Sequence, residues 1–295
     1  MSAAKERIDD LQRNGCRIIQ RPDLFCFGMD AVLLAAWAEA RRGDRILDLC
    51  SGNGIVPILM DARLPEEIRE EGSVHFTGVE INSTCVDMAR RSALMNGQSE
   101  RMHFLQGDVR GICGGKQSGA LSGDSPDEGL RGICGGKQSG ALSGDSPGED
   151  LRGREARGPD PEPAPDSFDC VTVNPPYMTG GGGLTGGNVQ KTIARHEVLC
   201  TVDDVAAAAA RAMKRGGHVY MVHRPHRLGD IFRAFDSRKL AVKRIRMVHP
   251  FADREANLVL IDAVKGGKSY VHAEKPLVIY REAGVYTEEL RALYG

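Results

Sequence analysis

Four consecutive residues at the end of one strand have the groups needed to hold an amine. Phe168–Val173 is a short apolar and β-branched run, which is the composition of a buried parallel strand. The strand must stop at Asn174-Pro175-Pro176-Tyr177, because two consecutive prolines fix φ and have no N–H to donate. Ligands bind at the carboxyl ends of strands in an open α/β sheet. We therefore expect this turn to face a ligand.

The turn suits a planar group that bears an amine. The Asn174 side-chain oxygen and the Pro175 carbonyl can each accept a hydrogen bond from an exocyclic NH2, and the Tyr177 ring can stack on the attached plane. When both amine protons are hydrogen-bonded, the nitrogen lone pair points away from the ring. In that direction it could attack an activated methyl group. An ordinary strand-end turn explains the same residues. The choice between the two interpretations depends on the residues upstream.

A glycine turn upstream predicts a nucleotide-binding entry into the same sheet. The strand Arg45–Leu49 runs directly into Cys50-Ser-Gly-Asn-Gly54, and the helical residues Ile55–Ala62 follow. Gly52 and Gly54 allow the backbone to approach a ligand closely. A strand, a glycine turn and a helix in this order indicate a doubly wound sheet. The spacing differs from the GxGxxG of dinucleotide sites, which argues against NAD.

Acidic residues lie at or just after the ends of the next two strands, where they could bind a nucleoside. Glu80 ends the strand that begins at Val74, and a carboxylate there can accept hydrogen bonds from both ribose hydroxyls. Asp108 follows the strand at 102–105 and could accept from an adenine amine, while the Val109 N–H donates to the ring. A solvated strand end explains Glu80 alone. Polar groups at three successive strand ends are poorly explained by coincidence.

The remaining pattern predicts an α/β domain with an antiparallel edge. We expect an opening helix at Ala3–Asn14, a strand at Cys16–Gln20 and, at Asp30, the N-cap of a helix over Ala31–Ala38. Further along the chain we expect helices at Val202–Met213 and Arg227–Arg238, a fifth strand at His218–His223 and an antiparallel pair of strands at Leu240–Val248 and Asn257–Val264.

A duplicated segment interrupts the domain. Residues 111–126 recur without change as 132–147, and a tract rich in Pro, Asp, Glu and Arg continues to Pro165. Such a composition cannot bury enough apolar surface to offset the entropy lost on ordering. We therefore interpret residues 110–166 as a flexible insertion that is dispensable for chemistry. The glycine-rich residues 178–188 suit a mobile lid or a passive linker equally well.

Charge and cysteine usage limit the possible partners. The net charge of the 295 residues is -1, so any nucleic acid must be bound by a local patch. No apolar run resembles a signal peptide or a membrane span, and the eight cysteines form no CxxC pair, which predicts reduced thiols in the cytoplasm. His223 and His226 lack a third ligand, so we expect no metal site. A basic stretch after the fifth strand could contact an RNA backbone: Arg224, Arg227, Arg238, Lys239, Lys243, Arg244 and Arg246.

Together these motifs resemble the class I S-adenosylmethionine-dependent methyltransferases that modify planar amines. This resemblance rests on Leu47-Asp-Leu-Cys-Ser-Gly-Asn-Gly54, Gly78-Val-Glu-Ile-Asn82 and Asn174-Pro-Pro-Tyr177. More narrowly, the chain is similar to the bacterial tRNA1(Val) adenine-N(6) methyltransferase family. The shared features are Phe27-Gly-Met-Asp-Ala-Val-Leu-Leu-Ala-Ala-Trp37, Ala194-Arg-His-Glu197, Lys243-Arg-Ile-Arg-Met-Val-His-Pro250, the segment from Glu255 to Gly267, and Tyr286-Thr-Glu-Glu-Leu290.

The resemblance implies a fold and a set of site residues. The fold would be a Rossmann-like, doubly wound sheet of seven strands, mostly parallel, with an antiparallel C-terminal hairpin. Residues 39–295 would form the catalytic domain, with residues 1–38 packed on it. Asp48, Gly52 and Gly54 would contact the methionine part of S-adenosylmethionine, Glu80 its ribose, and Asp108 and Val109 its adenine. Asp30, Ser51, Ile81 and Asn174 complete the implied cofactor-binding set, and Asn174, Pro175, Pro176 and Tyr177 would position the target amine.

The implied substrate is an adenine in RNA, specifically in a tRNA anticodon loop, with no membrane or metal involved. Because the cofactor supplies the driving force, catalysis would be mainly alignment. A protein glutamine methyltransferase acting on release factors is one rival, although such enzymes usually carry a helical N-terminal domain. A non-catalytic cofactor- or RNA-binding protein is another. DNA methylation would need a recognition region that we do not find. Cys50 departs from the glycine that the family often has there, which would tighten the cofactor turn.

Overall fold

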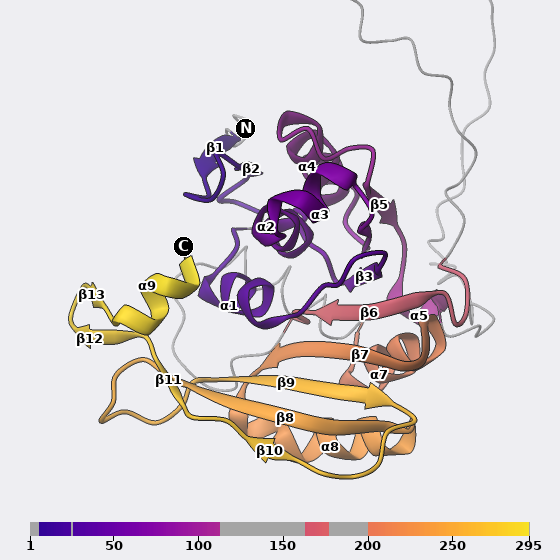
Figure 1. The fold of residues 1–295 in the computed structure, drawn as a ribbon, viewed down its shortest axis with the longest axis vertical. Coiled ribbons are helices and arrows are strands. Elements are labelled where there is room, and N and C mark those ends of the chain that lie inside the picture. Colours follow the sequence, from indigo (N-terminus) through magenta and orange to yellow (C-terminus); the bar gives the residue numbers. More distant parts are fainter. Residues whose placement is uncertain (1–5, 25, 113–162, 177–199, 295) are drawn as a thin grey trace, which may run out of the picture. The chain divides into compact units, whose positions relative to one another are not determined.

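One large sheet organises the part of the chain that the structure describes. The structure is a computed structural model that describes residues 6–24, 26–112, 163–176 and 200–294. Its main sheet, seen in Figure 1, has seven longer strands and two strands of two residues. In spatial order the longer strands are β5 (Met102–Gln106), β4 (His75–Glu80), β3 (Arg45–Leu49), β6 (Phe168–Val173), β7 (Met213–His223), β9 (Leu258–Lys265) and β8 (Leu240–His249). The short strands β10 (His272–Ala273) and β11 (Leu277–Val278) both pair with β8.

The strand directions confirm the predicted fold class. Strands β5, β4, β3, β6 and β7 are all parallel, whereas β9 runs antiparallel to both β7 and β8. The antiparallel pair expected near the C-terminus is therefore present at the edge of the sheet. The chain leaves β3 toward β4 and β5, then returns to β6 on the other side of β3. This change of direction opens a crevice at the carboxyl ends of β3 and β6, which is where doubly wound sheets bind ligands.

Helices cover both faces of the sheet, so its strands are apolar on both sides. Along β3, Ile46 packs into one core cluster, while Leu47 and Leu49 pack into the other. The first cluster includes residues of α1 (Met29–Trp37), α2 (Ile55–Arg63), α4 (Ser83–Met95) and α9 (Glu288–Tyr294). The second includes residues of α5 (Val109–Ile112), α7 (Val202–Ala212) and α8 (Leu228–Ser237). Apart from the N-terminal strands, the remaining elements in the described residues are α3 (Glu66–Glu71), the 3-10 turn η1 (Pro225–Arg227), and a hairpin of β12 (Tyr280–Glu282) and β13 (Val285–Tyr286).

The N-terminal segment is a hairpin, and the helix expected at Ala3–Asn14 is wrong. Strand β1 (Arg7–Asp10) pairs antiparallel with β2 (Arg17–Gln20), and the predicted strand at Cys16–Gln20 is confirmed. Gln12, Asn14 and Gly15 have φ values of 53°, 48° and 67°, which end any helix and reverse the chain. The polar stretch Arg7–Asp10 has little intrinsic strand propensity, so pairing with β2 decides its conformation.

Several expectations fall outside the described residues. These are residues 113–162 of the expected insertion, Tyr177, the glycine-rich loop 178–188 and the segment Ala194–Glu197. The expected domain boundary after residue 38 stays a prediction. Within the described ranges, no helix is long and apolar enough to cross a membrane.

Candidate active site

The carboxyl ends of β3, β4, β5 and β6 surround a cavity of about 450 Å³. Pro175 and Pro176 of the turn after β6 line it, whereas Tyr177 lies outside the described residues. Gly54 is the one residue of the predicted cofactor-binding set that does not line it. The others are brought together here: Asp30, Asp48, Ser51, Gly52, Glu80, Ile81, Asp108, Val109 and Asn174. Their roles in binding remain a prediction.

Left-handed residues shape the turn between β3 and α2. Cys50, Gly52 and Gly54 have φ values of 58°, 55° and 82°. Gly54 is the N-cap of α2, and a Cβ there would lie 2.7 Å from Phe104 Cζ, so the turn packs too closely on β5 for any side chain. A non-glycine residue in the left-handed region costs about 1–2 kcal/mol. Cys50 therefore adopts a strained backbone conformation at a position where the family that the chain resembles often has glycine.

Two backbone N–H groups fix the carboxylate of Glu80. Gly52 N donates to its Oε2 over 3.0 Å, and Asn82 N donates to its Oε1 over 2.9 Å. These bonds join the end of β4 to the glycine turn and to the start of α4, whose N-cap is Asn82. An ionised carboxylate has about four positions at which it accepts hydrogen bonds. Each oxygen of Glu80 can therefore accept a further bond from a ligand.

Asp48 forms a buried, hydrogen-bonded floor to the cavity. Its side chain accepts from Ser51 Oγ at 2.7 Å and from Thr172 Oγ1 at 2.6 Å, and the residue is only 2% exposed. Burial raises the pKa of Asp48 to about 7, although the Thr172 and Ser51 hydroxyls pull it down; nearby Glu80 adds to the rise. A cationic ligand against this carboxyl would restore its charge. The network also joins β3 to β6 at Thr172, two residues before Asn174.

Asn174 places an unsatisfied acceptor at the cavity. Its Oδ1 is buried and has no hydrogen-bond partner in the described part of the chain. A buried acceptor left unpaired costs about 1–3 kcal/mol, so such an atom indicates a missing donor. Pro175 and Pro176, which follow, have no N–H that could supply one. The residue directly after β6 is therefore prepared for a ligand that donates hydrogen bonds.

The position of Asp30 corrects one expectation. Helix α1 begins at Met29 and its N-cap is Gly28, which makes no side-chain cap, so Asp30 is not the N-cap. Asp30 instead lies in the first turn, where its Oδ1 accepts from Ala31 N at 2.9 Å. The helix begins earlier because Met29 already packs against the core. Asp30 faces the cavity, as the family resemblance implied.

Asp108 already has a cationic partner. Arg110 Nη2 lies 2.5 Å from Asp108 Oδ2, and Arg110 N donates to Oδ1 over 2.9 Å. Burial alone raises the pKa of Asp108, but the bonds from Arg110 more than reverse this and hold it below its ordinary value. The side chain remains ionised and lines the cavity beside Val109. The sequence had not indicated a role for Arg110 at this edge.

Sequence reasoning missed two parts of the cavity wall. One is the loop after β2, which contributes Pro22, Leu24 and Cys26. The other is Cys200, whose Sγ lies 3.8 Å from Cys50 Sγ. The neighbouring thiol and burial together raise the pKa of Cys50 well above its ordinary value. No motif signals either contribution, because these contacts join distant segments. Among the described residues, no three His, Cys, Asp or Glu side chains gather in a group that could hold a metal ion.

The basic stretch after β7 is largely engaged within the protein. Arg227 pairs with Asp230 at 2.9 Å, and Arg246 pairs with Glu289. Arg244 contacts three carboxylates and stacks on the ring of Trp37 at 4.9 Å. These three guanidinium groups are therefore already paired with carboxylates of the protein. Contact of this stretch with RNA stays a prediction.

Comparisons with known proteins agree with the fold. No family model matches the chain. It is 22% identical over 261 residues to a tRNA1(Val) (adenine(37)-N6)-methyltransferase of Aeromonas hydrophila, which covers 88% of this chain and 85% of the relative. A protein of the same name from Porphyromonas gingivalis is 21% identical over 255 residues, covering 85% and 76%.

One solved structure is similar across almost its whole length. It is a predicted O-methyltransferase from Agrobacterium tumefaciens, with a TM-score of 0.58, 22% identity, and coverage of 90% of this chain and 95% of that one. These similarities confirm the resemblance that the sequence motifs indicated. The chain has a methyltransferase fold and is similar along most of its length to tRNA1(Val) (adenine(37)-N6)-methyltransferases.

Proposed function

We propose that the protein is an S-adenosylmethionine-dependent methyltransferase that transfers a methyl group to the N6 amine of an adenine in RNA. The substrate would be the anticodon loop of a tRNA, in the cytoplasm. The observation that carries the proposal is Asn174, which lines the same cavity as Asp48 and Glu80 and whose buried Oδ1 has no hydrogen-bond partner among the described residues. One cavity thus presents an acceptor for an amine and carboxylates for a nucleoside that bears a positive charge.

The residues at the cavity fit this cofactor. A volume of about 450 Å³ is within the ordinary range for small-molecule sites. Glu80 has acceptor capacity for a ribose diol, because its two backbone bonds occupy only part of it. Asp30, Asp48 and Asp108 add carboxyl groups to the wall, which favours a ligand with positive charge and disfavours phosphates. This charge pattern suits S-adenosylmethionine better than a dinucleotide.

Asn174 and Pro175 would hold the target amine. Their oxygens would accept the two amine protons, which directs the nitrogen lone pair toward the cofactor side of the cavity. The bound cofactor would supply an electrophilic methyl group, so the chain needs to align the amine rather than deprotonate it. The hydroxyl of Thr172, bonded to Asp48, would fix the end of β6 relative to the cofactor floor. A base must leave its stack to enter, which is easiest in an unpaired loop.

The names of the relatives support an RNA substrate. Both relatives described above carry the name of a tRNA methyltransferase, and the alignments cover most of each chain.

Product identification tests the proposal. The protein would be incubated with S-adenosylmethionine carrying a labelled methyl group and with tRNA from cells that lack this modification, together with a release-factor protein in a parallel reaction. We expect labelled N6-methyladenosine after nucleoside digestion of the tRNA. Label in the release factor but not in RNA would reject an RNA substrate, and the absence of label from both would reject the catalytic proposal.

A further inference from the structure

The side chain of Asn53, in the middle of the glycine turn, does not face the cavity. Asn53 lies between Gly52 and Gly54, yet it is 0% exposed and does not line the cavity. Its Nδ2 donates to the backbone oxygen of Ile19 in β2 over 3.0 Å. Its Oδ1 is buried and has no partner within the described ranges. A buried amide with an unpaired oxygen contributes little to the stability of the fold. The bond from Asn53 to Ile19 therefore points to a role other than stability.

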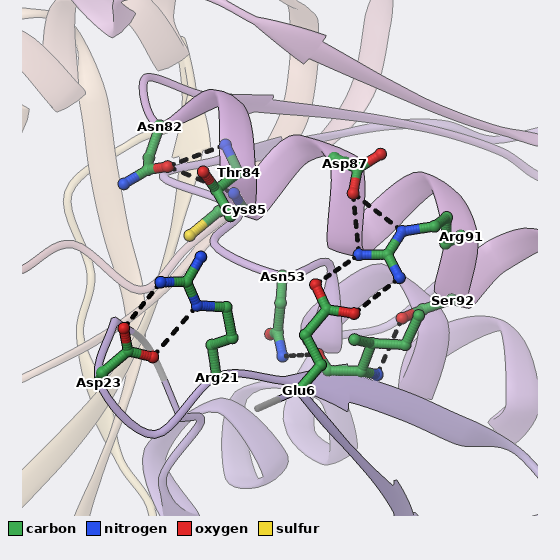
Figure 2. A network of polar contacts seen from close by, with 11 residues as sticks. Glu6, Arg21, Asp23, Asn53, Asn82, Thr84, Cys85, Asp87, Arg91 and Ser92 are labelled. Carbon is green, nitrogen blue, oxygen red and sulfur yellow. Dashed lines mark hydrogen bonds and ion pairs between the residues drawn. The ribbon is translucent and has the colours of Figure 1, made fainter. Parts of the chain in front are cut away.

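A second side chain bonds to the backbone of the same residue. Ser92 of α4 is 0% exposed, and its Oγ accepts from Ile19 N over 3.0 Å. Figure 2 shows Asn53 and Ser92 approaching this part of the chain from the glycine turn and from α4. The Ile19 side chain packs with Cys85 and Met88 of α4. Ile19 is thus fixed through its N–H, its carbonyl and its side chain.

The fixed residue leads directly into the cavity wall. Two residues after Gln20 the chain reaches Pro22, and the loop continues through Leu24 to Cys26, all three of which line the cavity. Phe27 N then donates to Gln20 Oε1 over 3.0 Å, which closes the loop on itself. We call Pro22–Leu24 and Cys26 the roof segment. The residues just before the roof segment, Ile19 and Gln20, are held by hydrogen bonds. Among the described residues, no side-chain hydrogen bond joins Pro22, Leu24 or Cys26 directly to the glycine turn.

We propose that Asn53 and Ser92 are positioning residues for cofactor binding, which act by clamping Ile19 so that the roof segment closes the cofactor cavity. This inference rests on the proposed cofactor. Without the clamp, the roof segment would populate other conformations, and the apparent affinity would fall with the fraction of molecules in the closed one. The N-terminal hairpin is then part of the cofactor site although most of its residues touch no ligand.

The two clamp residues allow a test that separates position from folding. Ser92→Ala removes the acceptor of the Ile19 N–H without altering any residue at the cavity. Gln98→Ala is the control, because Gln98 is also a buried amide, and its Nε2 donates to Asp61 Oδ2 and to the backbone oxygen of Ile58, both away from β2. S-adenosylhomocysteine binding would be measured by calorimetry on the full chain, together with thermal stability and the kcat and KM for S-adenosylmethionine.

We expect Ser92→Ala and Asn53→Ala each to raise the dissociation constant about 5–10-fold, the factor that one lost hydrogen bond gives. KM should rise in parallel while kcat at saturation stays within about twofold, and Gln98→Ala should lower stability without changing affinity. Wild-type affinity in Ser92→Ala, or an equal loss in Gln98→Ala, would overturn the inference while leaving the proposed function intact. A wild-type chain that binds no S-adenosylhomocysteine or S-adenosylmethionine would overturn both.

Discussion

Replacing Asp48 with asparagine should stabilise the ligand-free protein at alkaline pH and weaken cofactor binding at the same time. Asp48 is buried, and burial raises its pKa from the ordinary 3.8 to about 7. Because the folded-state pKa is the higher one, protonation stabilises the folded state. This contribution is fully present below the unfolded pKa and is lost as the pH rises through about 7.

The magnitude follows from the two pKa values. Each unit between them is worth about 1.36 kcal/mol, so the whole contribution is about 4 kcal/mol, of which about 2.5 kcal/mol is lost between pH 5 and pH 8. Asparagine has nearly the same shape and no charge, and its amide can bond to the Ser51 and Thr172 hydroxyls, both of which can donate or accept. The variant should therefore lack this part of the pH dependence.

Urea unfolding of both proteins from pH 5 to pH 8 measures the effect. The difference in unfolding free energy, variant minus wild type, should increase by about 2.5 kcal/mol over that range. S-adenosylmethionine binding at pH 8 should be at least about tenfold weaker in the variant, because an ion pair to the bound cation is lost. Stability curves that run parallel across this range would refute the account of Asp48 as a buried, titrating carboxyl.

Three further predictions concern the elements around the cavity. Gly54→Ala should destabilise the protein by at least about 2 kcal/mol and abolish cofactor binding, whereas Gly43→Ala, at the same φ of 82° but with nothing within 4 Å, should cost only about 1 kcal/mol in urea unfolding. Glu80→Gln should weaken cofactor binding at least about tenfold in calorimetry, because the amide group cannot accept from both Gly52 N and Asn82 N. Arg101→Leu should cost about 3–5 kcal/mol in the same unfolding assay, because it leaves the fully buried Asp61 carboxylate without the partner 2.6 Å away. Equal losses of unfolding free energy in the two glycine variants would contradict the first statement. Unchanged cofactor affinity in Glu80→Gln would contradict the second. A loss of unfolding free energy below about 1 kcal/mol in Arg101→Leu would contradict the third.

The parts of the fold that were predictable are those that local sequence specifies. The strand Arg45–Leu49 and its glycine turn combine a buried apolar run with residues that tolerate positive φ, and both signals lie within ten residues. Glu80 ends β4 and Asp108 follows β5 by two residues, so the parallel sheet alone brings them to one edge. The sheet order and the cavity at its switch point follow from this alternation of strands and helices.

The parts that were missed depend on contacts between distant segments. The strand Arg7–Asp10 forms only because β2 is available to pair with it. The bond from Asn53 to Ile19 joins residues 34 positions apart, and the Cys50–Cys200 contact spans 150 positions. The sequence alone suggests that Arg244 is an exposed cation. In the folded chain it contacts three carboxylates from distant segments. Periodicity and spacing carry no information about such pairs.

The central claim is that the cofactor cavity and the Asn174 acceptor form one site. Its most direct test is methyl transfer and cofactor affinity measured together in Asn174→Ala, with Asn257→Ala, an exposed asparagine between β8 and β9, as control. We predict at least about a 100-fold lower rate of transfer to tRNA, as expected when a reacting group loses its alignment, with a dissociation constant for S-adenosylmethionine within about threefold of wild type. Transfer at the wild-type rate in Asn174→Ala would contradict the account.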